Sequence, residues 1–401
     1  MSNLKELKFC MKDFLKLASY FMNICIVTET YPPEINGVAK TLHTIAKGLK
    51  ELGHKITIIR PHQKGQPKES NDTEETIVPS LPIPGYKGLH FGLPCRARLR
   101  SIWKKARPDI IYVATEGPLG LSAINVASKM QIAVTSGFHT NFHKYMRHYR
   151  LPGMAKLAER FLRKTHNQTL RTFAPTKEVI QQLNSMGVHN TRLLSRGVDT
   201  QVFNPKKRDA NLRQSWGAQS DEDCVALFVS RIAAEKNIPL AIQGFEKIQT
   251  IKPNAKCVFV GDGPERERLQ KKYPSFQFAG MQTGEALSKY YASGDLFIFP
   301  SLTETFGNVV TEAMASGLIP IAFDYAAPKQ FIQQDANGFL ANYEDEEDFL
   351  KQINRAFELE HLWPEIRLSA RQTSEALNWN TIITQFAEEL KIAFEENKTQ
   401  F

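Results

Sequence analysis

Short apolar runs alternate along the chain with longer segments in which apolar residues recur at helical spacing. In the first half, the runs at 23–28, 55–60, 109–113, 132–136 and 172–174 predict strands, and residues 38–52 predict a helix that ends at Gly53. A second series of predicted strands lies at 225–230, 256–260, 276–279, 296–299 and 319–323. Short apolar strands that alternate with helices indicate parallel sheets covered by helices on both faces.

The two series predict two α/β domains, at residues 22–197 and 198–378. The polar segment 197–219, in which Pro205 precedes three basic residues, has the composition of a linker. Three helices are predicted near the end of the chain, at 345–358, 363–376 and 379–397. Ligands of open α/β sheets bind beyond the carboxyl ends of the strands. We therefore expect the functional residues just after the strands, in a cleft between the domains.

The composition is that of a globular protein, with 42% hydrophobic and 23% charged residues among 401. No apolar stretch approaches the ~20 residues that a membrane-spanning helix needs. The five cysteines occur singly, which argues for a reducing compartment and against a structural zinc site. Lysines interrupt the apolar residues of segment 1–21, and Met22 directly precedes the first strand. We expect an N-terminal extension, or translation from Met22, and a cytoplasmic protein.

Basic residues are concentrated in the first domain. Residues 1–195 carry a net charge of +16 and the remainder −7, which together give +9. The excess lies mainly in 87–107 and 144–171, and the second stretch also carries Leu157, Phe161 and other apolar residues at helical spacing. This pattern suits a helix on an anionic membrane surface, although a merely solvated cationic face is the alternative. No nucleic-acid partner is expected, because no RNA-binding pattern or zinc-finger spacing occurs.

The strongest chemical signal is a pair of glutamates after the predicted strand 296–299. Glu304 lies in a loop, and Glu312 lies in a helix that opens near Asn308. Gly307 allows close backbone approach, and the first amides of the helix form an anion site. The two carboxylates can therefore each hold a polyol on either side of a phosphate. Two solvent-facing glutamates and a glycosidase-type acid/base pair are the alternatives.

Two further signals follow strands of the second domain. Arg231 and Lys236 come after strand 225–230, where two cations can neutralise a departing diphosphate without a metal. Gly261 and Asp262 belong to a tight Gly-Asp-Gly-Pro turn after strand 256–260. Taken alone, the first signal is also compatible with surface residues and the second with an ordinary β–α turn.

In the first domain, Asn36 and Gly37 join the first strand to its helix. This pair permits a left-handed backbone beside the helix N-terminus, which suits a phosphate. His139 and His143 follow the strand 132–136, and His139 is the stronger functional candidate. Asp221 and Asp223 match the D-x-D pattern of metal-dependent sugar transferases, but their polar surroundings favour a solvated loop.

With these motifs, the chain from about Met22 onward resembles family 4 glycosyltransferases of the GT-B fold. The resemblance is carried by the glutamate pair, by Arg231 with Lys236, and by the Gly-Asp-Gly-Pro turn. Runs 36–38, 115–120, 136–142 and 196–199 are similar to those of a subgroup. That subgroup contains GDP-mannose-dependent α-mannosyltransferases and the sulfoquinovosyl-diacylglycerol synthase type, many of which act on lipids.

The resemblance implies two Rossmann-like domains that face each other across a cleft, with the last helix packed back on the first domain. It also implies a retaining, metal-independent transfer from a nucleotide-diphosphate sugar to a lipid or glycan acceptor. His139 and Glu304 are the implied catalytic residues, at the reacting centre and on the donor sugar. The implied donor-binding residues are Gly37, Arg231, Lys236, Gly261, Asp262, Phe306, Gly307, Asn308, Val309 and Glu312. Among them, Glu312 holds the ribose and the two cations hold the diphosphate.

The chain departs from the family pattern at three positions. Asn36 stands where many members have a first glycine, Arg196 stands where an asparagine is common, and Phe306 stands where a glycine is common. We expect Phe306 to narrow the sugar pocket. The leading hypothesis is a mannosyltransferase that uses GDP-mannose; a UDP-sugar-dependent glucosyl or sulfoquinovosyl transferase is its closest alternative. An epimerase or phosphorylase, or a sugar-nucleotide-binding protein without transferase activity, are the remaining hypotheses.

Overall fold

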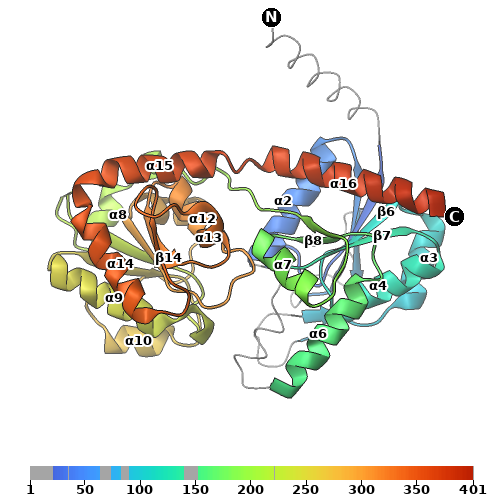
Figure 1. Cartoon of the computed structure of the whole chain (residues 1–401), viewed down its shortest axis with the longest axis horizontal. Coiled ribbons are helices and arrows are strands. Elements are labelled where there is room, and N and C mark those ends of the chain that lie inside the picture. The colour runs from blue at the N-terminus through green and yellow to red at the C-terminus, as the bar shows by residue number, and fades with distance from the viewer. Residues whose placement is uncertain are drawn as a thin grey trace, which may run out of the picture. The chain divides into compact units, whose positions relative to one another are not determined.

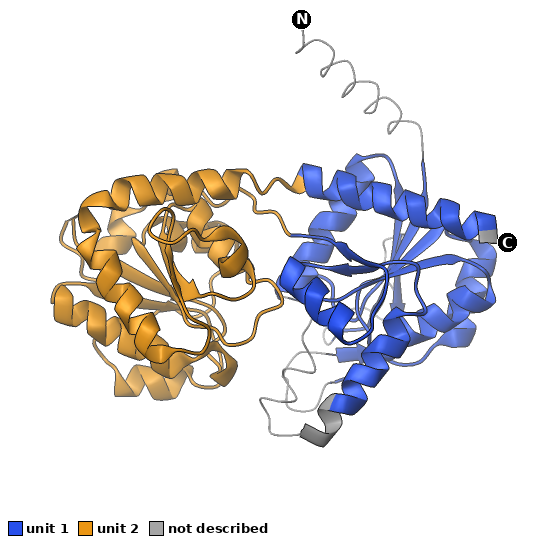
Figure 2. Ribbon diagram, viewed as in Figure 1, with its two compact units in different colours: residues 1–143, 152–195, 380–401 blue, residues 144–151, 196–379 orange. Residues whose placement is uncertain are grey.

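The structure is a computed structural model that describes residues 21–34, 36–63, 74–82, 90–139, 152–220 and 222–400. It divides into two compact units, shown in Figure 2. Among the described residues, the first unit extends to Ser195 and takes up again at Asn380, and the second comprises Arg196–Trp379.

The first unit is built on a parallel sheet of seven strands in the order β3-β2-β1-β6-β7-β8-β9. The strands are β1 (Asn23–Val27), β2 (Lys55–Pro61), β3 (Glu75–Val78), β6 (Ile110–Val113), β7 (Ala133–Gly137), β8 (Thr172–Ala174) and β9 (Thr191–Leu193). A small antiparallel pair consists of β4 (Ser80–Pro82) and β5 (His90–Gly92). The helices are α2 (Gly37–Glu51), α3 (Arg96–Lys105), α4 (Pro118–Lys129), α6 (Pro152–His166), α7 (Lys177–Ser185) and α16 (Trp379–Gln400) (Figure 1).

The second unit is built on a parallel sheet of six strands in the order β12-β11-β10-β13-β14-β15. Its strands are β10 (Val225–Val229), β11 (Lys256–Val260), β12 (Gln277–Phe278), β13 (Leu296–Phe299), β14 (Ile319–Phe323) and β15 (Phe339–Ala341). Its α-helices are α8 (Ala210–Ser215), α9 (Ile238–Ile251), α10 (Arg266–Lys272), α11 (Gly284–Ala292), α12 (Asn308–Ala315), α13 (Ala327–Phe331), α14 (Glu346–Glu358) and α15 (Trp363–Glu375). Three short 3-10 helices complete it, η1 (Pro205–Lys207), η2 (Ala234–Lys236) and η3 (Glu360–Leu362).

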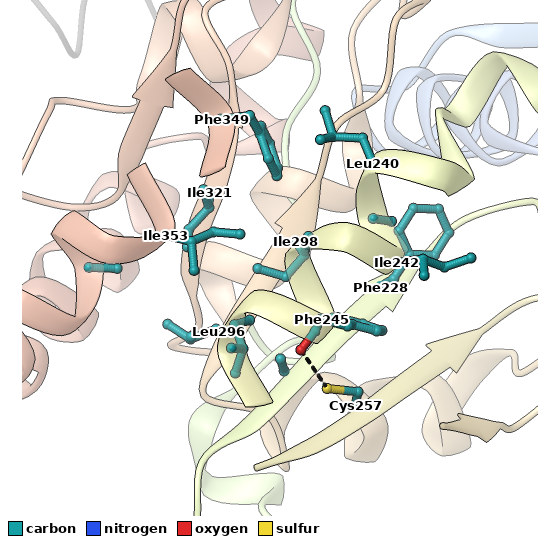
Figure 3. Packing of buried hydrophobic residues seen from close by; sticks show 14 of the residues in the cluster. Phe228, Leu240, Ile242, Phe245, Cys257, Leu296, Ile298, Ile321, Phe349 and Ile353 are labelled. Carbon is teal, nitrogen blue, oxygen red and sulfur yellow. Dashed lines mark hydrogen bonds between the residues drawn. The ribbon is translucent and has the colours of Figure 1, made fainter. Parts of the chain in front are cut away.

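Both faces of the second sheet are buried, and this explains the apolar runs in the sequence. Along β10, Ala226 and Phe228 pack into one core with residues of α9 and α14, and Figure 3 shows Phe228 of β10 and Phe245 of α9 in this cluster. The alternate residue Leu227 packs into a second core on the opposite face with residues of α12 and α15. Since successive side chains of a strand point to opposite faces, a strand covered on both faces has no polar position.

The predicted fold class is confirmed, and the predicted strands lie at or within about a residue or two of their observed bounds. Strands β3, β4, β5, β9 and β15 are additional. The expectation of a linker at 197–219 is wrong, because this segment folds onto the second unit. Within it, Arg208 donates to the Gly294 carbonyl at 3.2 Å and pairs with Asp295 at 3.1 Å, while Asp209 caps α8. The charged side chain of Arg208 thus binds a distant part of the unit.

The last helix returns to the first unit, as the resemblance implies. Arg171 forms ion pairs with Glu389 at 3.4 Å and with Glu396, and both glutamates lie on α16. The hydrogen bond from Arg171 lowers the pKa of Glu396, and the positive charge of the guanidinium adds to this effect. Within the described part of the chain, none of the helices has the length and apolar character to cross a membrane.

Candidate active site

Three loops meet at the carboxyl edge of the second sheet and are joined by backbone hydrogen bonds. The loop after β10 is bound to the loop after β11 through Ile232 N–H, which donates to the Asp262 carbonyl at 2.9 Å. It is bound to the loop after β13 through Leu302 N–H, which donates to the Glu235 carbonyl at 3.3 Å. The topology therefore brings together motifs that lie far apart in the sequence.

Two ion pairs occupy this edge. The Lys236 ammonium contacts the Glu304 carboxylate, and both side chains are largely buried. The Arg231 guanidinium contacts the Glu235 carboxylate, which is buried, while Arg231 itself is exposed over 43% of its side chain. Because each cation rests on a carboxylate, it is held in place near the ends of the strands. An anion that approaches from solvent can add to these cations as a further partner.

Glu304 is the best-supported carboxylate of the group. Its Oε1 accepts from the Ser301 hydroxyl at 2.9 Å as well as from Lys236, and its backbone carbonyl accepts from the Tyr325 hydroxyl at 2.8 Å. The sequence predicted Glu304 and Lys236 as site residues, and the structure brings them into contact. Ser301 and Tyr325 were not predicted, since single hydroxyl residues leave no spacing signal.

Glu312 lies on α12 and is 7% exposed. Its Oε2 accepts from the hydroxyl of Tyr291, a fully buried residue of α11, at 3.2 Å. Burial raises the pKa of Tyr291 well above its usual range, and the neighbouring carboxylate adds to this effect. The phenol therefore stays protonated and donates. Sequence reasoning found the carboxylate but missed Tyr291.

The start of α12 has the geometry expected of an anion site. Gly307 has φ of +100°, a conformation that favours glycine, and it precedes Asn308 and Val309 in the first turn. Asn308 accepts a hydrogen bond from Arg196 at 3.2 Å. Phe306 is 1% exposed and packs on Phe331. The ring of Phe306 is therefore part of the protein interior.

The turn after β11 requires glycine at two positions, because a side chain at either would collide with the neighbouring backbone. A Cβ on Gly261, where φ is +140°, would lie 1.9 Å from the Ser230 carbonyl oxygen, and one on Gly263 would lie 2.2 Å from that of Ile232. The turn consequently packs on the backbone of the loop that carries Arg231. Asp262, at its tip, pairs with Arg266 at 3.3 Å.

In the first unit, His139 follows β7 and is 4% exposed. Its Nε2 shares a hydrogen bond of 2.7 Å with the hydroxyl of Tyr112 on β6. A second histidine, His166 of α6, is also buried. Its Nδ1 lies 2.9 Å from the hydroxyl of Ser136 on β7, and its Nε2 lies 3.1 Å from Glu116 Oε1. Neither Tyr112 nor this buried group was predicted. His143 and Asp221 lie outside the described residues, as do residues 1–20.

The expected left-handed backbone at Asn36 and Gly37 is not found. Asn36 is extended, with φ of −153°, and its side chain caps α2 by accepting from the amides of Val38 and Ala39 at 3.0 and 2.8 Å. The side chain thus takes two amides that a phosphate could otherwise use. Gly37 is the first residue of the helix, and its backbone N–H remains a candidate donor to a phosphate.

Glu29, two residues after β1, carries a partly buried carboxylate that sequence reasoning passed over. It accepts from the amides of Gly92 at 2.5 Å and Leu119 at 2.9 Å, and so joins β1 to β5 and to the start of α4. Burial raises the pKa of Glu29 to about 7, against the opposing effect of these hydrogen bonds.

In the part of the chain that the structure describes, no group of three or more His, Cys, Asp or Glu side chains is placed to hold a metal ion.

Two family models match the chain. Glycosyltransferase Family 4 matches residues 35–202, and Glycosyl transferases group 1 matches residues 210–376. A GDP-mannose-dependent alpha-mannosyltransferase of Corynebacterium glutamicum is 32% identical, over 81% of this chain and 78% of its own. The sulfoquinovosyl transferase SQD2 of Arabidopsis thaliana is 28% identical, over 88% and 70%. The alpha-monoglucosyldiacylglycerol synthase of Acholeplasma laidlawii is 28% identical, over 81% and 86%.

Solved structures give the same fold. HepE of Anabaena, in complex with UDP, superposes with a TM-score of 0.72 at 18% identity, over 92% of this chain and 100% of its own. The sequence and fold therefore define a glycosyltransferase with two Rossmann-like domains, the GT-B architecture. The chain belongs to glycosyltransferase family 4, and it is a hexosyltransferase.

Proposed function

We propose that this enzyme transfers mannose from GDP-mannose to a lipid or glycan acceptor, with retention of configuration and without a metal ion. The observation that carries the proposal is the contact of Lys236 with Glu304, with Arg231 on the same loop after β10 at the carboxyl edge of the sheet. Two cations suit a diphosphate, and a carboxylate suits two hydroxyls of a hexose. The similarity to the mannosyltransferase of C. glutamicum supports the choice of donor.

In the proposed reaction, the bond between C1 of the sugar and the diphosphate oxygen breaks as the acceptor oxygen forms a new bond to C1 from the same face. The acceptor proton passes to the departing phosphate. Arg231 and Lys236 neutralise the charge that develops on the leaving group, and this replaces the role of a metal ion. Glu312 holds the ribose, while Glu304 and His139 orient the sugar.

The second candidate is a donor based on UDP, with transfer of a glucosyl or sulfoquinovosyl group. It is favoured by the similarity to the sulfoquinovosyl transferase and to the glucosyldiacylglycerol synthase, over 88% and 81% of this chain. Both candidates use the same cations and carboxylates, so they differ only in the base and the sugar.

A panel of nucleotide sugars, assayed in EDTA with diacylglycerol vesicles or glycan acceptors, distinguishes these candidates. We expect release of GDP from GDP-mannose and an α-linked product by NMR. Release of UDP from a UDP-sugar would select the second candidate. Activity that EDTA abolishes and that only a divalent cation restores would contradict the metal-independent mechanism.

We also propose that helix α6 docks on an anionic membrane that presents the acceptor. Two apolar side chains one turn apart are exposed on this helix, Leu157 by 67% and Phe161 by 42%. Four exposed cations lie around them, Lys156, Arg160, Arg163 and Lys164. Apolar side chains flanked by cations suit an interfacial helix, at roughly 1 kcal/mol for each well-placed cation.

Sedimentation with vesicles tests the membrane proposal. We expect binding to vesicles that contain phosphatidylglycerol, weaker binding at high salt, and at least about a tenfold loss in the double variant Leu157→Ser/Phe161→Ser. Leu368→Ser in the second unit, where the side chain is 59% exposed, is the matched control and leaves binding unchanged. Equal binding to neutral vesicles at high salt would exclude this docking mode.

A further inference from the structure

The side chain of His139 is held by a partner that is itself completely buried. Tyr112 is 0% exposed and lies on β6, the neighbour of the strand that His139 follows. The 2.7 Å between its hydroxyl and His139 Nε2 is a short, well-formed hydrogen bond. The two rings meet edge to face, with centroids 6.3 Å apart. This contact fixes which ring nitrogen of His139 points into the protein.

Gly137, the last residue of β7, makes room for this contact. A Cβ on Gly137 would lie 2.3 Å from the Tyr112 hydroxyl and 2.9 Å from His139 Nε2. Any other residue at position 137 would therefore push the two groups apart. The Ser-Gly-Phe-His run thus has a steric reason for its glycine, apart from any backbone conformation.

The ring of Tyr112 is held in turn by the C-terminal helix. Phe386 of α16 packs edge to face on Tyr112, with centroids 5.0 Å apart, and on Phe173 of β8, at 4.8 Å. Phe386 is 2% exposed. The helix is anchored to the same region by the ion pairs of Arg171 with Glu389 and Glu396. The packing of α16 therefore helps to fix the position of the Tyr112 hydroxyl, which contacts His139.

We propose that Tyr112 is a positioning residue for His139, and that α16 holds it in place through Phe386. The phenol donates to Nε2, so the neutral imidazole carries its proton on Nδ1. This direction follows because a phenol is a better hydrogen-bond donor than a neutral imidazole N–H, and an imidazole nitrogen is the better acceptor. The proposal rests on the proposed function only where it assigns His139 to the donor sugar.

The tautomer of His139 can be measured without any activity. In protein labelled with ¹⁵N-histidine, long-range ¹H–¹⁵N spectra report which ring nitrogen carries the proton, and the signals that disappear in His139→Gln identify the residue. We expect the Nδ1–H form in the wild type and a mixture of tautomers in Tyr112→Phe, which removes only the hydroxyl. A proton on Nε2 in the wild type, or identical His139 signals in both proteins, would overturn the proposal.

Steady-state kinetics supply the second test. With the donor found in the panel, we expect Tyr112→Phe to lower kcat roughly tenfold while the donor KM changes less than about twofold. Phe386→Leu, which keeps an apolar side chain, should lower kcat by a smaller factor. Tyr290→Phe removes a phenol that packs on Trp216 and leaves both constants unchanged.

The two failures are distinguishable. If wild-type protein turns over no nucleotide sugar, the proposed function fails, while the spectra still decide the role of Tyr112. If the wild type is active and Tyr112→Phe keeps its kcat, Tyr112 only fills space and the positioning role is overturned.

Discussion

Glu304 and Lys236 meet in the free protein, and each keeps the other near the ends of the strands. Both side chains lie at about 15% exposure or less, so their pairing is more than a solvated surface contact. Ser301 supplies a second donor to the carboxylate at 2.9 Å. Sequence reasoning identified the two charged residues from chemistry, but it could not find the hydroxyl that supports them.

Tyr291 is the residue whose loss should affect nucleotide binding most selectively. The variant Tyr291→Phe removes the hydroxyl that donates to Glu312 at 3.2 Å and leaves the ring. Since a hydrogen bond to a charged group contributes about 1.5–3 kcal/mol, part of which supports the bound geometry, we expect roughly three- to tenfold weaker binding of the nucleoside diphosphate. Titration calorimetry measures this change directly.

Tyr290→Phe is the matched control for Tyr291→Phe, because Tyr290 is the preceding residue of α11 and packs on Trp216. Its nucleotide affinity should equal that of the wild type. Equal affinity in both variants would show that Glu312 needs no support from Tyr291.

At the scale of elements, the turn after β11 depends on Gly261. The variant Gly261→Ala places a Cβ 1.9 Å from the Ser230 carbonyl oxygen at a φ of +140°. The backbone of two loops must then move, so we expect a loss of more than about 3 kcal/mol in stability and a large loss of activity. Thermal unfolding measures the first effect.

Gly284→Ala provides the comparison within the same unit. Gly284 also has positive φ, at +54°, but among the described residues no atom outside its own helix and chain neighbours lies within 4 Å of its added Cβ. Its cost should be about 1 kcal/mol. If the two variants unfold at the same temperature, the close approach between position 261 and the Ser230 carbonyl does not affect stability.

The elements that sequence reasoning found and missed differ in how local their signals are. Strands such as β10 and β13 are buried on both faces, so uninterrupted apolar runs marked them. Strand β9 is half exposed and short, and its sequence gave no such run. The segment with Arg208 was predicted to be a linker from its polar composition. Its ion pair with Asp295 joins residues that are distant in the sequence, so no local pattern indicates it. Likewise, the cap formed by Asn36 depends on a side-chain geometry that composition does not reveal.

At the scale of the molecule, Glu29 should make stability depend on pH. Burial raises the pKa of Glu29 from 4.5 to about 7, so the folded protein holds this proton more tightly than the unfolded chain does. The resulting stabilisation is complete below about pH 4.5 and is lost as the pH rises through 7. We expect Glu29→Gln to reduce the change in unfolding free energy between pH 5 and 8 by about 2 kcal/mol.

Thermal unfolding at several pH values checks this prediction. Glu51→Gln, which alters an exposed carboxylate of α2, is the control and should keep the wild-type pH dependence. An unchanged pH dependence in Glu29→Gln would mean that Glu29 titrates alike in the folded and unfolded states.

The division into two α/β units was predictable, because each has its own series of apolar strands. The predictions for site residues divide by unit as well, with His139 and Gly37 in the first and the cations and glutamates in the second. The sequence pattern could also indicate that the last helix returns to the first unit, through the family resemblance. It could not indicate that Phe386 of this helix packs on the partner of His139.

The most direct test of the central claim compares turnover of the nucleotide sugar by the wild type, Lys236→Met and Glu304→Gln. The account predicts release of the nucleoside diphosphate by the wild type, in EDTA, and at least about a hundredfold lower kcat/KM in each variant, with thermal unfolding that shows both variants folded. Wild-type turnover in both variants would contradict the assignment of this edge of the second sheet as the donor site.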